Sequence, residues 1–222
     1  MKNITKKFGI VTALNEISFK INRGEVHVLL GENGAGKSTL MKILSGVYQP
    51  TSGKITINGK DYDQLTPKLS FDNKISIIYQ ELSVINELSI QENLFVGKLP
   101  VKKLFGIEVV DYEYMKDLTK KILSKIGLNK SPEILVEELT ISEKQQVEIA
   151  KALVSDANVI IMDEPTTSLT ENETEHLFRI IRQLKLEGKG IVYISHKLKE
   201  IKEIGAVVTV LKDGTDVGTR EI

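Results

Sequence analysis

The chain lacks cysteine and tryptophan, and aromatic residues make up only 5% of its 222 residues. The absence of cysteine excludes disulfides and thiolate metal sites, and it is compatible with a reducing cytosol. An excess of charge of one sign is also missing, because 30 basic residues balance 30 acidic ones. No overall field therefore favours nucleic acid or acidic lipid as a partner.

Long hydrophobic runs are absent as well. No stretch approaches the roughly 20 apolar residues that cross a bilayer, and residues 1–7 lack the apolar segment of a secretion signal. We therefore expect any work at a membrane to be done from the aqueous side, through a partner. The hydrophobic fraction of 41% is nevertheless enough for a sizeable core in one large domain.

The clearest motif present is a glycine-rich loop that fits the pattern G-x-x-x-x-G-K-[S/T] of phosphate-binding loops. An apolar run at 26–30 predicts a buried strand before it, and apolar periodicity predicts a helix after it. The glycines let backbone N–H groups point at phosphate oxygens, and the helix N-terminus faces the same anion. A glycine-rich turn without a ligand is the weaker alternative. The candidate phosphate-binding residues are Gly31, Glu32, Asn33, Gly34, Ala35, Gly36, Lys37, Ser38 and Thr39.

Two adjacent carboxylates follow a second buried strand. The apolar run 159–162 leads directly into Asp163 and Glu164. Asp163 suits a carboxylate associated with Mg²⁺, as does the Ser38 hydroxyl, and Glu164 suits the group that polarises an attacking water. A solvated acidic turn is the alternative, but a sheet brings such distant strands together.

Three single residues are weaker candidates. Gln80 and His196 each follow a predicted strand, at the end where open α/β sheets place their ligands. A lone glutamine is more often a surface residue, and a lone histidine is more often structural, although we favour a γ-phosphate-sensing role for His196. Phe8 suits stacking on a nucleobase or simple core packing, and the sequence leaves both open.

The remaining pattern predicts an α/β fold with a parallel sheet and a phosphate-binding-loop core. Residues 3–21 and the Asn58-Gly59 turn predict an antiparallel β subdomain, and Ser142 with Gln145 fits a capping box for the next helix. We expect one domain over 1–222, with the core at 1–88 and 133–222 and a helical insert at 89–132. Further expected elements are helices at 89–95, 111–126 and 171–187, a surface loop or hairpin at 100–106, strands at 75–79 and 191–194, and a terminal hairpin at 206–217.

Taken in order, these motifs resemble the nucleotide-binding cassette of ATP-binding cassette (ABC) transporters over essentially the whole chain. The resemblance implies ATP and Mg²⁺ as ligands, with Mg²⁺ at Ser38, Gln80 and Asp163. It also implies that Phe8 stacks on adenine, that Gln80 links to a membrane subunit, that Glu164 is the catalytic base and that His196 is the switch histidine.

The chain departs from the family pattern in two places. The family's Leu-Ser-Gly-Gly-Gln element, which in the family dimer covers the γ-phosphate held by the other cassette, is degenerate here. Its residues are Leu139, Thr140, Ile141, Ser142 and Glu143. Side chains at the two positions where the family has glycines obstruct close approach of the backbone to the phosphate, and Glu143 brings negative charge towards it. In addition, Thr170 replaces the usual aspartate after Ser168-Leu169.

Further phrases, at 29–41, 78–83, 147–151 and 218–221, resemble the first cassette of bacterial monosaccharide importers, and 102–111 is most similar to the D-allose branch. Family chains usually carry two cassettes, so the resemblance implies a shortened or separated first cassette. It implies a peripheral position on the cytoplasmic face of the membrane. Its partners would be a second cassette, integral permease subunits and, indirectly, a periplasmic or extracellular sugar-binding protein, without nucleic acid.

Two alternatives stay open. One is a soluble ABC-type regulatory or nucleic-acid-associated ATPase without a membrane partner, which the neutral charge disfavours. The other is that the isolated chain binds ATP but barely hydrolyses it, because the complementary element lies on the missing half.

Overall fold

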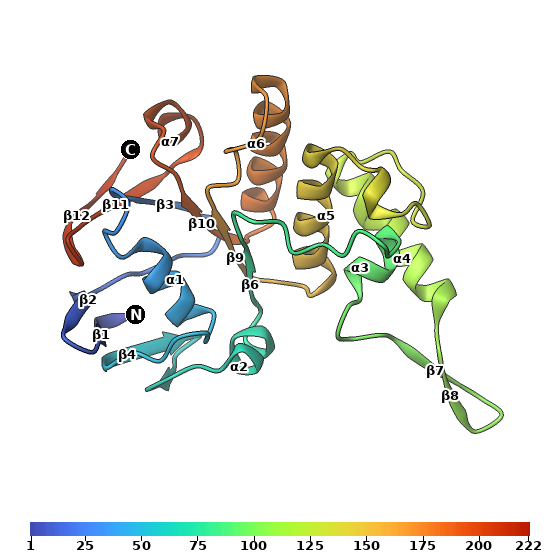
Figure 1. The fold of residues 1–222 in the computed structure, drawn as a ribbon, viewed down its shortest axis with the longest axis horizontal. Helices are drawn as coiled ribbons and strands as arrows, with labels where there is room; N and C mark the ends of the chain where they lie inside the picture. The colour runs from blue at the N-terminus through green and yellow to red at the C-terminus, as the bar shows by residue number, and fades with distance from the viewer. The chain divides into compact units, whose positions relative to one another are not determined.

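The computed structural model describes residues 1–222 and divides into two compact units. The core unit comprises 1–80, 157–165 and 178–222, and the helical unit comprises 81–156 and 166–177. Figure 1 shows the elements of both units. None of the helices has both the length and the hydrophobicity of a membrane span.

The main sheet of the core unit has six strands in the order β12-β11-β3-β10-β9-β6. Every residue of β10 is buried, as expected for a central parallel strand covered on both faces. β6, β9, β10, β3 and β11 run parallel, and β12 pairs antiparallel with β11. The strands are β3 (Val26–Leu30), β6 (Ile75–Ile78), β9 (Val159–Asp163), β10 (Gly190–Ile194), β11 (Val207–Lys212) and β12 (Thr215–Glu221).

A four-stranded antiparallel sheet in the order β2-β1-β4-β5 completes the core unit. Helix α1 (Lys37–Leu44) contributes Leu40, Met41 and Ile43 to a hydrophobic cluster that also contains residues of both sheets. The strands are β1 (Lys2–Phe8), β2 (Val11–Ile17), β4 (Ser52–Ile57) and β5 (Lys60–Tyr62), and the other helices are α2 (Pro67–Asp72), α6 (Glu171–Leu186, from residue 178 on) and α7 (Leu198–Ile204).

The helical unit is built on α3 (Ile90–Leu94), α4 (Tyr112–Ile126) and α5 (Ile141–Val154), with a 3-10 turn at Val136–Glu138. Asp111 is the N-cap of helix α4, and its side chain accepts from the backbone N–H of Tyr114; Gly127, with φ +74°, is the C-cap. A cap acceptor at the start and a left-handed glycine at the end are standard helix boundaries. The expected helix at 111–126 is therefore confirmed.

The capping box predicted for α5 was wrong by two residues. Thr140 is the N-cap: its hydroxyl accepts from the Glu143 N–H, and the Glu143 carboxylate accepts from the Thr140 N–H. Ser142 is buried within the first turn of the helix, so it cannot act as the cap. Both residue pairs have the right spacing, and only the backbone conformation at Thr140 distinguishes them.

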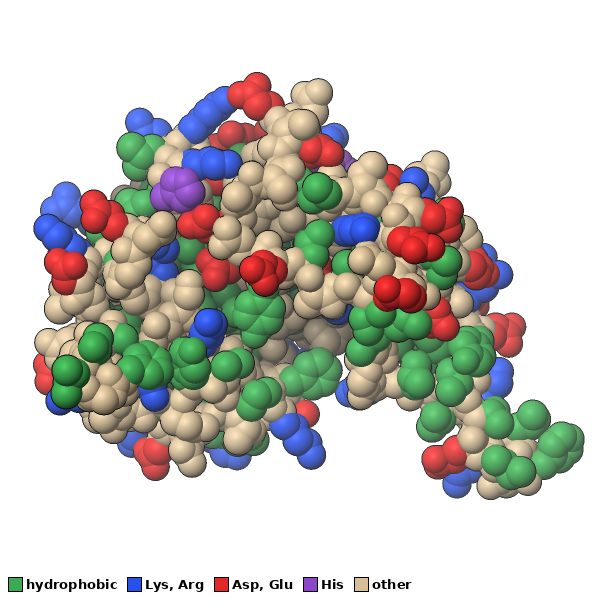
Figure 2. All heavy atoms as spheres, in the orientation of Figure 1, with side chains coloured by type: hydrophobic (Ala, Val, Ile, Leu, Met, Phe, Trp, Pro, Cys, Tyr) green, Lys and Arg blue, Asp and Glu red, His purple; other side chains and the backbone are tan.

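The helical unit is larger than the insert expected at 89–132. Helix α5 packs on α3 and α4, so it groups with them rather than with the main sheet. The segment expected to be a loop or hairpin is a hairpin of β7 (Val101–Leu104) and β8 (Ile107–Val110). Hydrophobic side chains gather on this hairpin in Figure 2, and Phe105 in its turn is 97% exposed.

Two glycines with nearly the same backbone conformation test how tightly α1 is joined to the following segment. Gly46 has φ +77°, and a Cβ there would lie 2.3 Å from the Thr66 carbonyl carbon. Gly59 has φ +81° with nothing within 4 Å. We expect Gly59→Ala to cost about 1 kcal/mol, from the left-handed conformation alone. Gly46→Ala should cost about 1–3 kcal/mol more, because backbone must also shift. Urea unfolding of both variants measures the difference, and equal midpoints would contradict the packing described here.

Candidate phosphate-binding site

The glycine loop joins the end of β3 to the start of α1. Gly36 is the N-cap of α1 with φ +103°, and a Cβ there would lie 2.6 Å from the Leu14 side chain and 2.9 Å from the Ala13 carbonyl oxygen. Only glycine fits this conformation and this space. The loop therefore stays close to β2 while the free N–H groups at the start of α1 face the cleft beyond it.

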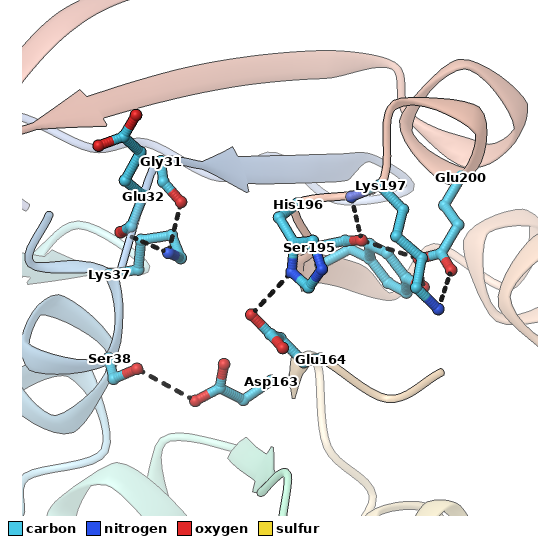
Figure 3. Close-up of polar contacts among 11 residues, drawn as sticks. Gly31, Glu32, Lys37, Ser38, Asp163, Glu164, Ser195, His196, Lys197 and Glu200 are labelled. Carbon is cyan, nitrogen blue, oxygen red and sulfur yellow. Dashed lines mark hydrogen bonds and ion pairs between the residues drawn. The ribbon is translucent and has the colours of Figure 1, made fainter. Parts of the chain in front are cut away.

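The Lys37 ammonium lies inside the loop. Its Nζ donates to the carbonyl oxygens of Gly31 at 2.6 Å and Glu32 at 3.0 Å, and the residue is only 6% exposed (Figure 3). A buried ammonium requires such acceptors, since an unpaired charge in this position is costly. These carbonyls thus hold a positive charge beside the N-terminus of α1, which is the arrangement an anion requires.

Ser38 and Asp163 meet although 125 residues separate them. Ser38 Oγ donates to Asp163 Oδ2 at 3.3 Å. Burial raises the pKa of Asp163, and the Ser38 hydrogen bond only partly offsets this effect. The protein alone therefore does not fully compensate the Asp163 charge, and a cation beside it would.

One cleft of about 390 Å³ collects most of the residues predicted to bind phosphate and Mg²⁺. It lies entirely within the core unit. Of the loop residues that do not line it, Gly31 and Glu32 hold Lys37, and Ala35 is buried in the core. Ala13 of β2 also lines the cleft, and no sequence signal marked it. The lining residues are Ala13, Asn33, Gly34, Gly36, Lys37, Ser38, Thr39, Gln80, Asp163 and Glu164.

Glu164 and His196 are brought together at the carboxyl ends of β9 and β10. The Glu164 N–H donates to the carbonyl oxygen of Ile194 at 3.1 Å, and Glu164 has φ +45°. The His196 Nδ1 lies 3.2 Å from Glu164 Oε1 (Figure 3). The turn at Glu164 lets both neighbouring carboxylates line the same cleft, whereas a continuing strand would direct them to opposite faces.

Phe8 lies at the end of β1, outside the set of cleft-lining residues. Phe8 is 43% exposed. The centroid of its ring lies 5.2 Å from that of Tyr48, in an edge-on arrangement, and 4.8 Å from Lys6 Nζ. Simple core packing does not describe this residue. The partly exposed ring beside Tyr48 is compatible with stacking on a base.

The degenerate element at 139–143 lies in the helical unit. The Glu143 carboxylate accepts from the Thr140 N–H at 2.9 Å and pairs with Lys130 Nζ at 3.1 Å. Burial acts to raise the pKa of Glu143, but these contacts outweigh it and lower the pKa. Its negative charge is therefore compensated locally. Ile141, where the family pattern has a glycine, is 55% exposed.

Thr170, which replaces the family's aspartate, keeps a capping role. Its hydroxyl and its N–H both contact Glu173 Oε2 at 2.8 Å at the start of α6. Threonine and aspartate are both good N-cap residues. The hydroxyl of Thr170 therefore supplies a cap for α6 at the position where the family pattern has aspartate.

The parallel sheet, the glycine loop and the carboxylates at the strand ends together define a phosphate-binding-loop nucleotide-binding fold. Residues 14–167 match the protein family described as ABC transporter. This chain belongs to that family.

The chain is similar to several curated import proteins. It is 52% identical, over 98% of its length, to the D-allose import ATP-binding protein of Escherichia coli (strain K12), of which it covers 42%. It is 47% identical, over its full length, to the galactose/methyl galactoside import ATP-binding protein of Clostridium tetani (strain Massachusetts / E88), of which it covers 44%. The chain thus spans less than half the length of these relatives.

Solved structures show the same fold. The chain is similar to a nucleotide-free ATP-binding cassette from an ABC transporter, with a TM-score of 0.88, 26% identity, and coverage of 99% of this chain and 89% of that one. A dimeric post-hydrolysis cassette bound to ADP and Pi gives a TM-score of 0.82 at 25% identity, covering 99% of this chain and 97% of that one.

The raised pKa of Asp163 gives a stability prediction for the nucleotide-free protein. Because the pKa of Asp163 is higher in the folded than in the unfolded protein, the folded protein binds the carboxyl proton more tightly. The free energy of unfolding therefore falls as the pH rises from the unfolded-state pKa of Asp163 to its raised folded-state pKa. Asp163→Asn should therefore raise the Tm at pH 7, and the gain should shrink as the pH approaches 4. Thermal unfolding between pH 4 and pH 8 measures this.

Asp61→Asn is the matched control for this experiment. Hydrogen bonds from Thr56 and Lys54 lower the pKa of this exposed carboxyl, which is the opposite sign. The control should not raise the Tm at pH 7. An Asp163→Asn variant with an unchanged or lower Tm would show that burial does not penalise this charge.

Proposed function

We propose that this chain is the ATP-binding and ATP-hydrolysing cassette, the first of two, of an ABC-type importer of a monosaccharide. The observation that carries the proposal is the convergence of Lys37, Ser38, Asp163 and Glu164 on one cleft. The import proteins to which the chain is similar support the transport role. They do not favour the soluble regulatory or nucleic-acid-associated alternative.

The proposed site uses positioning and charge. The backbone N–H groups of the glycine loop and the Lys37 ammonium bind the phosphates of ATP. Ser38, Gln80 and Asp163 offer a hydroxyl, an amide and a carboxylate oxygen in the same cleft. This is the hard oxygen donor set that suits Mg²⁺, and bound Mg²⁺ supplies positive charge against the transferring phosphoryl group.

Glu164 and His196 act on the other side of the phosphoryl group in this proposal. The Glu164 carboxylate orients the attacking water and accepts its proton. His196, at 3.2 Å from that carboxylate, fixes its orientation and senses the γ-phosphate. The hydrogen bond from the Glu164 N–H to Ile194 keeps the two strand ends aligned.

The degenerate element at 139–143 makes this chain a poor cover for a partner's nucleotide in our proposal. Because Glu143 is paired with Lys130, its charge contributes less repulsion than its position in the sequence indicated. The obstacle is then mainly steric, from the side chains of Ile141 and Ser142 where the family pattern has glycines. The site that hydrolyses ATP would then be formed by this chain's own cleft together with the covering element of the second cassette.

The proposal places the chain at the cytoplasmic face of the membrane, bound to permease subunits that receive sugar from an external binding protein. D-allose is one candidate sugar, on the strength of the 52% relative and the resemblance of 102–111. The galactose-importing relative is almost as similar, so the choice of sugar rests with the permease and binding protein.

Glu164→Gln tests the assignment of the water-orienting residue. Loss of the base should lower ATP turnover by about 10²–10⁴-fold, while nucleotide affinity stays close to that of the unchanged protein. Steady-state phosphate release, with the second cassette present, and a fluorescent-nucleotide titration measure the two quantities. Glu221→Gln, on the exposed strand β12, is a control for loss of one carboxylate. Equal turnover of both variants would refute the role of Glu164.

Reconstitution tests the transport assignment. The isolated chain should bind ATP with little turnover, and adding the second cassette should increase turnover, because the second cassette supplies an intact covering element. Affinity purification from membranes should recover integral permease subunits with the full-length protein. Recovery of ribosomes or DNA instead would support the nucleic-acid-associated alternative.

A further inference from the structure

A buried carboxylate outside the phosphate-binding cleft connects β10 to the first turn of α7. Glu200 is 5% exposed, and its Oε2 accepts from the Tyr193 hydroxyl and from the Ser195 hydroxyl, both at 2.8 Å. Its Oε1 pairs with Lys197 Nζ at 3.1 Å. Three donors thus satisfy a charge that would be costly to bury alone.

The same network closes the turn that carries His196. Ser195 Oγ donates to Glu200 and accepts from the Lys197 N–H at 3.1 Å, so both neighbours of His196 are tied to Glu200 (Figure 3). Ser195 is 3% exposed, whereas the His196 side chain is 62% exposed. The ring has little packing of its own to hold it, and its position depends on the backbone on either side.

We propose that Glu200 is a positioning residue for ATP turnover: it fixes the turn 195–197 and thereby keeps the His196 ring within reach of the Glu164 carboxylate. The inference rests on the proposed function, because it acts through the roles given there to Glu164 and His196. The contacts described above join Glu200 to Tyr193, Ser195 and Lys197, so its proposed effect on His196 passes through the turn 195–197.

Two substitutions separate the acceptor from the charge. Glu200→Leu leaves the Tyr193 and Ser195 hydroxyls without their acceptor, so the turn is released. Glu200→Gln keeps an amide oxygen that accepts from both hydroxyls and loses only the ion pair with Lys197. Displacement of a catalytic group typically reduces rate far more than ground-state binding.

The experiment measures kcat for ATP and nucleotide Kd in the full-length protein, with the second cassette present. We expect Glu200→Leu to lower kcat by about 10-fold or more, with Kd changed by less than about 2-fold. Glu200→Gln should retain most of the turnover. The double variant Glu200→Leu/His196→Ala should be no slower than His196→Ala alone, because both changes remove one function.

Thr209→Val is the matched control for loss of a buried hydrogen bond. Thr209 is 1% exposed and its hydroxyl lies 2.7 Å from His27 Nε2. It lies on β11, which β3 separates from β10 and the turn that follows β10. This variant should lower the Tm without lowering kcat. A fall in kcat that follows the fall in Tm across Thr209→Val and Glu200→Leu would show a merely structural role and overturn the proposal.

Further outcomes decide the question in either direction. Rate losses that multiply in the double variant would show that Glu200 does not act through His196. Amide hydrogen exchange at Lys197, measured in the chain alone, should be faster in Glu200→Leu than in the unchanged protein.

If Glu200→Leu does not fold, Glu200→Gln and Ser195→Ala carry the same test, because Ser195→Ala removes the link between Glu200 and the Lys197 N–H. If His196→Ala turns over normally while exchange at Lys197 still responds to Glu200, the proposed role of His196 has failed and the positioning role with it.

Discussion

The site depends on the parallel pairing of β3, β10 and β9, which ends three strands at one edge of the sheet. The glycine loop follows β3, Glu164 follows β9, and His196 stands just beyond β10. In the register of β9 and β10, Asp163 lies opposite Ile194, and the Glu164 N–H then donates to the Ile194 carbonyl. Buried hydrophobic side chains fix this register, since a slip by one residue would exchange the side chains that pack on the two covered faces of the sheet.

Around that edge, each buried charge is held by specific partners. Carbonyl oxygens of the loop hold the Lys37 ammonium, and the Ser38 hydroxyl contacts Asp163. Hydroxyls and Lys197 hold the Glu200 carboxylate. The three cases differ in how complete the compensation is: Glu200 has several donors, whereas Asp163 retains a raised pKa because burial outweighs its one hydroxyl contact. The least compensated charge lies where the proposed function requires a cation, as expected when a site is formed for its ligand.

In the helical unit, the element at 139–143 has a regular local structure although its sequence departs from the family pattern. Thr140 and Glu143 form a regular helix start on either side of Ile141 and Ser142, where the family pattern has glycines, and Lys130 adds an ion pair. The degenerate element is therefore well ordered in its own right. In the proposed importer, this chain covers the nucleotide of the second cassette poorly, because side chains at 141 and 142 prevent the close backbone approach to phosphate that glycines allow. The second cassette would still cover the nucleotide in this chain's own cleft.

The sequence by itself determined the elements whose signals are local. Apolar runs gave β3, β9 and β10, and the glycine spacing gave the loop at 31–39. The Asn58-Gly59 turn appears as expected between β4 and β5, with φ of +49° and +81°. Such signals can be read locally because backbone conformation at glycine and hydrophobic periodicity depend on neighbouring residues.

Only the tertiary structure decided which distant residues meet. Two capping boxes had equal spacing, and the backbone at Thr140 selected one of them. The partnership of Glu143 with Lys130, the place of Ala13 in the cleft wall and the network around Glu200 left no mark in the sequence. The physical reason is that hydrogen bonds and ion pairs of a buried charge depend on where packing places its neighbours, and packing is a property of the whole chain.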